Sequence, residues 1–306
     1  MERIGFALYR RRDLDVPPPA TECDDEVVPA NRHSARQWRR RHLELLLALR
    51  GHLPEGSFLI GRSAAVLWRL PVPPGDDDRI EIGRFYPARA PRRPEFRSRQ
   101  PRPHLVRLGR RFGLAAADPA TVWAMLAVQL EFDDVVALGD AVIRRVRIPG
   151  TSLLRRPPLA RLAQLEAAAS AGRRAGAALL REALPLLTTT SASPPESHLR
   201  LRLRRWGAPR PELDHDVFAR SGRLLGCSEI AFPKYRLALE YEGDHHRILT
   251  SQWNRDIEKY RHYEQNGWEA IRVTGGLLYR REAELRGQLF EALVRRGWTP
   301  GQDAEW

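Results

Sequence analysis

The sequence predicts a mixed α/β protein of the α+β class, in which a mostly helical N-terminal domain with a few short strands precedes a mixed sheet flanked by helices. Three observations support this prediction. Apolar residues at helical spacing dominate the N-terminal part, strand-like runs gather in the C-terminal part, and a sharp change in composition separates the two. We therefore expect one domain over residues 1–187 and a second over 188–306.

Size and composition favour a basic, cytoplasmic protein of two domains. The 306 residues exceed what one core usually spans, and 42% hydrophobic residues suffice for real cores. Lys and Arg number 51 against 38 Asp and Glu, which gives a net charge of +13 and favours phosphate-bearing partners. No apolar run approaches the ~18–20 residues of a membrane span. The first residues lack the apolar core of a signal peptide, and Cys23 and Cys227 are too few for a disulfide framework or a Cys-rich zinc site.

The N-terminal part reads as helices joined by short strands. Asp118 followed by Pro119 is a strong helix start, and the Pro- and Arg-dense segment 87–103 predicts an exposed loop or β-wing. Residues 1–32 predict an irregular opening. The predicted helices are 34–50, 63–70, 118–130, 133–146, 159–170 and 175–184, and the predicted strands are 57–60, 79–85 and 105–108.

The C-terminal part begins with the Thr-, Ser- and Pro-rich segment 188–195, which marks the domain boundary. Strand patterns then alternate with helical ones, which predicts a mixed sheet. The predicted helices are 196–206, 254–266 and 282–296, and the predicted strands are 213–220, 224–232, 236–241 and 269–273.

Three glutamates are candidates for a metal site. Glu240 and Glu242 end an apolar strand and share one face of it, and a hairpin brings Glu229 of the preceding strand beside Glu240. Converging carboxylates repel one another unless a cation neutralises them, and oxygen ligands suit Mg²⁺ or Mn²⁺. His245 and His246 follow the strand, where an imidazole can act as acid or base. The alternative is ordinary strand-end charge, but acids rarely end a buried strand without a partner.

Flanking residues extend this candidate site. Glu196 at a helix start is either an outer metal ligand or an acid that complements the helix dipole. Arg255 and Lys259 lie four apart on a helix, so they share a face that either contacts a phosphate or forms a surface pair.

Residues 194–296 resemble the very-short-patch-repair (Vsr) endonuclease domain of the PD-(D/E)XK restriction-endonuclease superfamily. The matching pieces, in order, are Pro195-Glu196, Glu229-Ile230, Leu239-Glu240-Tyr241-Glu242-Gly243-Asp244-His245-His246, Arg255-Asp256 and Gly267-Trp268 leading to Arg272. Two departures stand out. The family usually has Asp at positions 229 and 242, and the superfamily lysine after the second acid is absent.

The resemblance implies a restriction-endonuclease-like fold and the residues of a nuclease site. Glu229, Glu240 and Glu242 would bind Mg²⁺ or Mn²⁺, and His246 would act as acid or base. Glu196, His245 and Asp256 would support the site, and nucleic acid would contact Arg255, Lys259 and Arg272.

The N-terminal part is similar to AbiEi-type antitoxin and regulator proteins of actinobacteria. The similarity lies in the segments 61–71 and 118–127, in which Trp68 and Trp123 stand. It implies a DNA-binding or regulatory domain and a possible cognate toxin. A loop rich in arginine either follows a DNA backbone or is simply solvated; its arginines are Arg92, Arg93, Arg97, Arg99 and Arg102.

The sequence therefore predicts a metal-dependent DNA endonuclease or nickase. The alternative is a non-catalytic DNA-binding regulator or antitoxin with a degenerate nuclease fold. A third option is a protein-interaction module that makes no contact with DNA.

Overall fold

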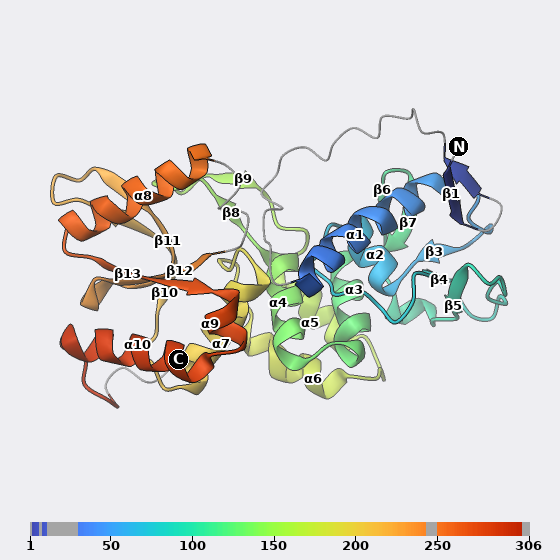
Figure 1. Ribbon diagram of the computed structural model, residues 1–306. Helices are drawn as coiled ribbons and strands as arrows, with labels where there is room; N and C mark the ends of the chain where they lie inside the picture. Colours follow the sequence, from blue (N-terminus) through green and yellow to red (C-terminus); the bar gives the residue numbers. More distant parts are fainter. Residues whose placement is uncertain (1, 6–7, 11–29, 243–249, 302–306) are drawn as a thin grey trace. The chain divides into compact units, whose positions relative to one another are not determined.

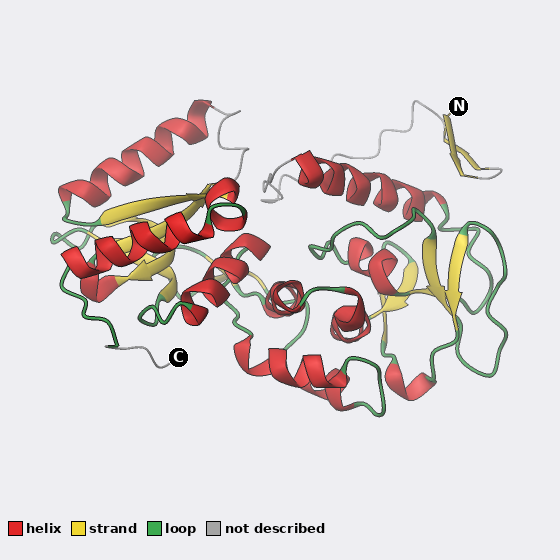
Figure 2. Cartoon of the chain, turned by 60° about the horizontal axis from the view of Figure 1, so that its bottom comes forward, coloured by secondary structure: helices red, strands yellow, loops and turns green. Residues whose placement is uncertain are grey.

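The computed structural model confirms the α+β class, with mixed sheets flanked by helices (Figures 1 and 2). It describes residues 2–5, 8–10, 30–242 and 250–301, with side chains for 35–242 and 258–301. These residues form two compact units. The first comprises His33–Ile143 and Leu159–Leu187 together with the antiparallel strands β1 (Glu2–Gly5) and β2 (Leu8–Arg10), and the second comprises Arg144–Pro158 and the chain from Thr188 onward. Among the described residues, no helix is both long and apolar enough to span a bilayer.

The first unit is built on a five-stranded mixed sheet of order β5-β4-β3-β7-β6. Its strands are short, as predicted, but they form a continuous sheet in which β3 pairs antiparallel to β4 and parallel to β7. Its strands are β3 (Phe58–Leu59), β4 (Ile80–Gly83), β5 (Phe96–Arg99), β6 (Leu108–Arg111) and β7 (Leu114–Ala117). Its helices are α1 (Ala30–Ala48), α2 (Gly61–Leu67), α3 (Pro119–Leu126), α4 (Phe132–Ile143), α5 (Leu162–Ser170) and α6 (Ala177–Ala183).

Local chemistry explains where helix α3 begins and how it is anchored. The Asp118 side chain accepts a hydrogen bond from Thr121 N at 2.8 Å, and Pro119 occupies the first helical position, where no amide proton is needed. Trp123 is fully buried, and its indole donates to the Val135 carbonyl of α4 at 2.9 Å. The Asp118-Pro119 cap therefore fixes the start of α3, and with it the position of Trp123 in this core.

Glu81 on β4 is a buried acid of the first unit and is only 5% exposed. Its carboxylate accepts from the Arg62 amide at 3.3 Å, next to the start of α2. Its own amide donates to the Ser63 hydroxyl at 2.8 Å. Burial raises the pKa of Glu81, while the charges of Arg62, Arg97 and Arg99 oppose that rise.

The second unit is a four-stranded sheet of order β10-β11-β12-β13, antiparallel except for the parallel pair β12 and β13. Helix α8 covers one face, and α7, α9 and α10 cover the other (Figure 1). Its strands are β10 (Glu212–Phe218), β11 (Leu224–Phe232), β12 (Leu237–Glu242) and β13 (Glu269–Thr274). Its helices are α7 (Pro194–Arg205), α8 (Thr250–Gln265), α9 (Gly275–Tyr279) and α10 (Glu282–Arg295).

The segment 144–158 belongs to the second unit although it precedes residue 188 in the chain. It forms a hairpin of β8 (Val146–Arg147) and β9 (Leu154–Arg156). Arg147 attaches the hairpin to β10, with ion pairs to Asp214 at 3.0 Å and to Asp216. Burial of one guanidinium between two carboxylates explains why this segment packs with the sheet that follows it in sequence.

Candidate functional site

The candidate site lies where strands β11 and β12 part. Their pairing ends at Ile230 and Leu239, so Glu229 and Glu240 are the next residues on the two strands. Alternation places Glu229, Glu240 and Glu242 on the face covered by α8, because Ile230, Leu239 and Tyr241 pack into the core on the opposite face. Beyond the last strand pair, the Glu229 carboxylate accepts from the Tyr241 amide at 2.8 Å.

Glu240 is the most enclosed of the three strand glutamates, with 4% of its surface exposed. Its Oε2 atom accepts from the Lys259 ammonium of α8 at 2.8 Å. Its Oε1 atom is buried and has no hydrogen-bond partner among the described residues. The Ser228 hydroxyl donates to the Ile230 carbonyl at 3.0 Å, and together with the Glu229 amide it also lies close enough to the Glu240 carboxyl group to lower its pKa. A buried carboxylate oxygen without a donor is costly, which makes this atom a candidate ligand for a cation.

Glu196 approaches the same place from the first turn of α7. Ser193 caps this helix, and its hydroxyl donates to Glu196 Oε1 at 3.0 Å, while the Ala192 amide donates to Oε2 at 2.7 Å. The carboxylate therefore closes the turn that starts α7, which is the helix-start role considered for it in the sequence. It is nevertheless only 5% exposed and lies within electrostatic range of Glu240.

The pKa directions show that Glu196, Glu229 and Glu240 share one neighbourhood, which we call the carboxylate cluster. Burial raises the pKa of Glu196 to about 7, against the opposing effect of its two hydrogen bonds and of Arg144. The pKa of Glu229 lies well above its ordinary value, first because of burial and then because of repulsion by Glu196 and Glu240. Although part of Glu229 remains exposed, protein atoms surround its carboxyl group. Burial also raises the pKa of Glu240, and the Lys259 charge opposes this.

Glu242 does not join the carboxylate cluster. Its carboxylate forms an ion pair with the Arg272 guanidinium of β13, which donates from Nη2 at 2.6 Å and also from Nε. The Tyr260 hydroxyl lies 3.5 Å from the same carboxylate, and Arg272 stacks over the Tyr260 ring at 5.4 Å. The parallel register explains the pair, since Arg272 lies opposite Glu240, two residues before Glu242 on the same face.

The remaining predicted residues are placed only in part. His245 and His246 lie outside the described residues. Arg255 and Asp256 fall in α8, in turns for which only the backbone is described. Lys259 contacts Glu240 directly, a pairing that was not predicted from the sequence. The available signal was composition, because all but two of the 51 cationic residues are arginine and Lys259 is one of those two.

The fit of a divalent cation rests on the carboxylate cluster. Repulsion by Glu196 and Glu240 raises the pKa of Glu229, so a nearby positive charge would stabilise these carboxyl groups. The buried Glu240 oxygen is a hard ligand of the kind that Mg²⁺ and Mn²⁺ prefer. Within the described ranges, no group of three or more His, Cys, Asp or Glu side chains lies close enough together to hold a metal ion. Lys259 supplies part of the compensating charge.

Comparison with known proteins finds two uncharacterized proteins of Mycobacterium tuberculosis, one from strain CDC 1551 and one from strain H37Rv. Each is 28% identical to this chain over 190 residues, which is 62% of this chain and 66% of the relative. The match thus covers just under two thirds of each relative's length. No family model matches the chain, and no solved structure matches it.

Proposed function

We propose that the second unit is a divalent-metal-dependent DNA endonuclease or nickase that hydrolyses phosphodiester bonds. The observation that carries the proposal is the carboxylate cluster, in which a buried Glu240 oxygen has no donor among the described residues while Lys259 holds the other oxygen. Buried acids that repel one another cost free energy in a folded protein, and their presence together is typical of a site that binds a cation.

Each residue has a defined part in this proposal. Glu229 and Glu240 would hold the cation, and Glu242 would join them if its ion pair with Arg272 opened. A bound Mg²⁺ or Mn²⁺ supplies charge that stabilises the leaving oxygen and lowers the pKa of an attacking water. Lys259 favours the ionised form of Glu240 and is positioned to donate to a phosphate oxygen. His246 remains the predicted acid or base, and Arg255 and Arg272 remain predicted phosphate contacts.

The test is cleavage of supercoiled plasmid by the purified chain with Mg²⁺ or Mn²⁺. We expect nicked or linear product from the wild type and a loss of at least ~100-fold in Glu240→Gln, because the substitution removes a ligand charge without changing shape. The matched control is Glu264→Gln, an exposed residue of the same helix as Lys259, which should cleave normally. Intact plasmid with every metal, or equal cleavage by wild type and Glu240→Gln, contradicts the proposal.

A second function is favoured by a different observation. Within the described residues, Glu240 and Glu242 each already have a protein cation, Lys259 and Arg272. A nuclease fold that has become a DNA-binding regulator or antitoxin would keep such pairs without needing a metal. In that case the chain retards DNA on a gel, leaves it intact and releases it steeply as salt rises. A cognate toxin remains a prediction from the sequence.

A further inference from the structure

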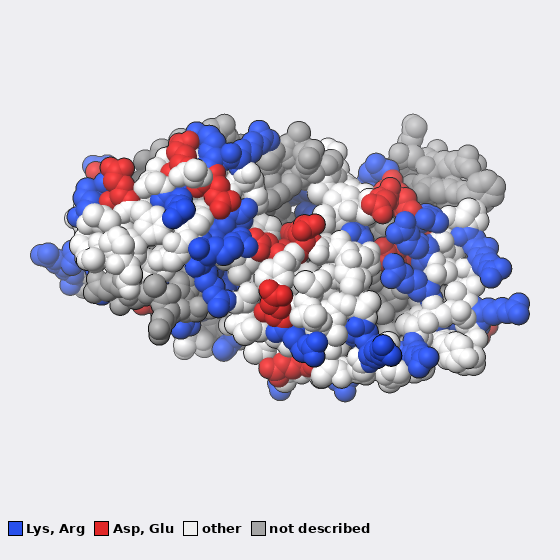
Figure 3. Space-filling model, turned by 90° about the horizontal axis from the view of Figure 1, so that it is seen from below, with Lys and Arg blue, Asp and Glu red and all other residues white. Residues whose placement is uncertain are grey.

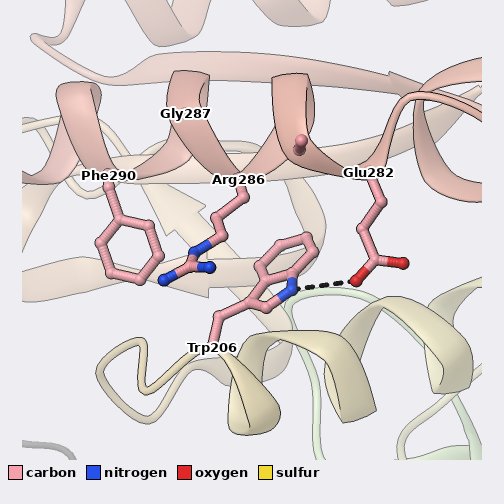
Figure 4. A pocket seen from close by; sticks show the side chains of 6 residues that line it. Trp206, Glu282, Arg286, Gly287 and Phe290 are labelled. Carbon is pink, nitrogen blue, oxygen red and sulfur yellow. Dashed lines mark hydrogen bonds between the residues drawn. The ribbon is translucent and has the colours of Figure 1, made fainter.

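A groove on the second unit lies apart from the carboxylate cluster, between the end of α7 and the exposed side of α10. Two adjoining hollows of about 710 and 380 Å³ share Trp206, Arg286 and Phe290 as lining residues. We call this the Trp206 groove. Figure 4 shows the Arg286 guanidinium lying between the Trp206 and Phe290 rings, with Gly287 above them on α10.

The rings of the Trp206 groove are held in place and remain partly exposed. The Trp206 indole donates to Glu282 Oε1 at 3.1 Å, and Arg202 fixes the other oxygen of the same carboxylate at 3.1 Å. Phe290 rests on the buried Trp298, with ring centroids 5.2 Å apart. Trp206 and Phe290 themselves stay half-exposed. Rigid, half-open aromatic faces lose little conformational entropy on binding a flat ligand.

The charge of the Trp206 groove is positive. Arg286 is exposed, stacks over Phe290 at 5.8 Å and has no carboxylate partner among the described residues. Glu282, the acid that lines the groove, is already engaged by Trp206 and Arg202. Arg204 and Arg205 are exposed in the last turn of α7, and Lys and Arg side chains form a band on this face of the second unit (Figure 3).

We infer that the Trp206 groove binds an unpaired nucleobase together with its phosphate, within a single strand of nucleic acid. Aromatic faces stack on any base, and an unpaired guanidinium both stacks and binds phosphate. An acidic peptide would match the charge but would leave the half-exposed Trp206 ring without a flat partner. The inference goes beyond the proposed hydrolysis, because stacking requires no metal and no carboxylate.

Helix α7 runs from the carboxylate cluster to the Trp206 groove. Glu196 lies in its first turn and Trp206 directly follows its last residue, so about ten residues at ~1.5 Å each separate them by roughly 15 Å along the helix axis. A strand held in the Trp206 groove therefore lies near the carboxylate cluster of the same unit.

Gly287 offers a test that leaves the packing intact. Gly287 lines the groove, and a Cβ atom added at this helical glycine meets no atom within 4 Å, so we expect a larger side chain there to occupy part of the groove. The full chain is titrated in EDTA against a fluorescent single strand of about 12 nucleotides, and against a duplex of the same sequence, by anisotropy. The variants are Gly287→Leu and Arg286→Ala, and the control is Gln288→Leu, an exposed neighbour on α10 that does not line the groove.

We expect Gly287→Leu and Arg286→Ala each to weaken single-strand binding about tenfold while duplex binding changes less than about twofold. Gln288→Leu and Glu264→Gln should bind like the wild type. Because the titration is made in EDTA, single-strand binding is measured without a divalent metal, so this inference and the proposed hydrolysis can fail independently. Unchanged single-strand binding in Gly287→Leu overturns the inference, as does an equal loss for single strand and duplex in Arg286→Ala. The inference is also overturned if Gly287→Leu still binds the oligonucleotide but no longer binds an acidic, tryptophan-containing peptide that the wild type binds.

Discussion

The two units bury glutamates in different surroundings. In the first unit, Glu81 lies at the start of α2, accepts from the Arg62 amide and is offset by three arginines. In the second unit, Glu196 and Glu240 raise the pKa of Glu229, Glu240 raises the pKa of Glu196, and Lys259 is paired with Glu240. A single buried acid beside a helix start and arginines is explained by the fold alone. Three acids that repel one another are not explained by the fold alone, so we expect the functional site in the second unit.

The largest expected effect separates the two sets of glutamates by activity. Glu229→Gln should lower the rate of plasmid cleavage by at least ~100-fold, because a neutral amide is a poor ligand for a divalent cation. Glu81→Gln, the matched buried substitution in the first unit, should leave the rate within about twofold. Equal cleavage rates for the two variants, measured with the same metal and plasmid, would contradict a functional difference between the glutamates of the two units.

A second prediction tests the structural role of Glu81. A Cβ atom at Gly61 would lie 1.7 Å from Glu81 Oε2, and the backbone there has φ +52°. Gly61→Ala should therefore lower the free energy of unfolding by roughly 2–4 kcal/mol in urea titrations. Gly287→Ala, at an open helical position, should instead raise it by up to ~1 kcal/mol. A neutral Gly61→Ala would mean that Glu81 is free to move away.

A third prediction concerns the pH dependence of stability. The pKa of Glu196 is raised from its ordinary 4.5 to about 7, so the folded protein holds a proton that the unfolded chain has lost between these values. The free energy of unfolding should therefore fall as pH rises from 4.5 to about 7, by about 3 kcal/mol from Glu196 alone.

The same cluster provides the control for this pH effect. Glu229→Gln removes one repelling charge and should flatten the fall more than Glu81→Gln, which removes an isolated acid. Urea titrations at several pH values give the comparison. A free energy of unfolding that rises with pH across this window contradicts the assigned protonation.

The smallest expected effect concerns Glu242. Its pair with Arg272 is partly exposed, with 45% of the arginine side chain accessible. Glu242→Gln should therefore lower the free energy of unfolding by no more than about 1 kcal/mol, and added salt should reduce the difference. A loss of unfolding free energy as large as that of Gly61→Ala would contradict this assignment of Glu242 to a partly exposed ion pair.

The fold followed from local signals where those signals were strong. Asp118 with Pro119 predicted the start of α3, and the apolar run before Glu240 predicted β12. The Pro- and Arg-rich segment 87–103 was predicted to be an exposed loop or β-wing. Only 96–99 of it forms a strand, β5, which is ordered by its pairing with β4. The helix α9 was not predicted, since its five residues are too few to show periodicity.

The candidate site was predicted at the level of strands but not of contacts. The strand pattern placed Glu229, Glu240 and Glu242 on one face, yet it cannot say which cation each carboxylate meets. Lys259 reaches Glu240 from 19 residues away, and Arg272 reaches Glu242 from 30 residues away. Such pairs depend on how α8 packs and on the register of β13, which are set by the tertiary fold.

The most direct test of a cation at the carboxylate cluster is a crystal structure grown with Mn²⁺ and analysed by its anomalous scattering. We predict an anomalous peak at about 2.1 Å from carboxylate oxygens of both Glu229 and Glu240, with no peak at Glu81. Glu229 and Glu240 oxygens that share no ion at saturating Mn²⁺, with the Lys259 contact unchanged, would contradict it.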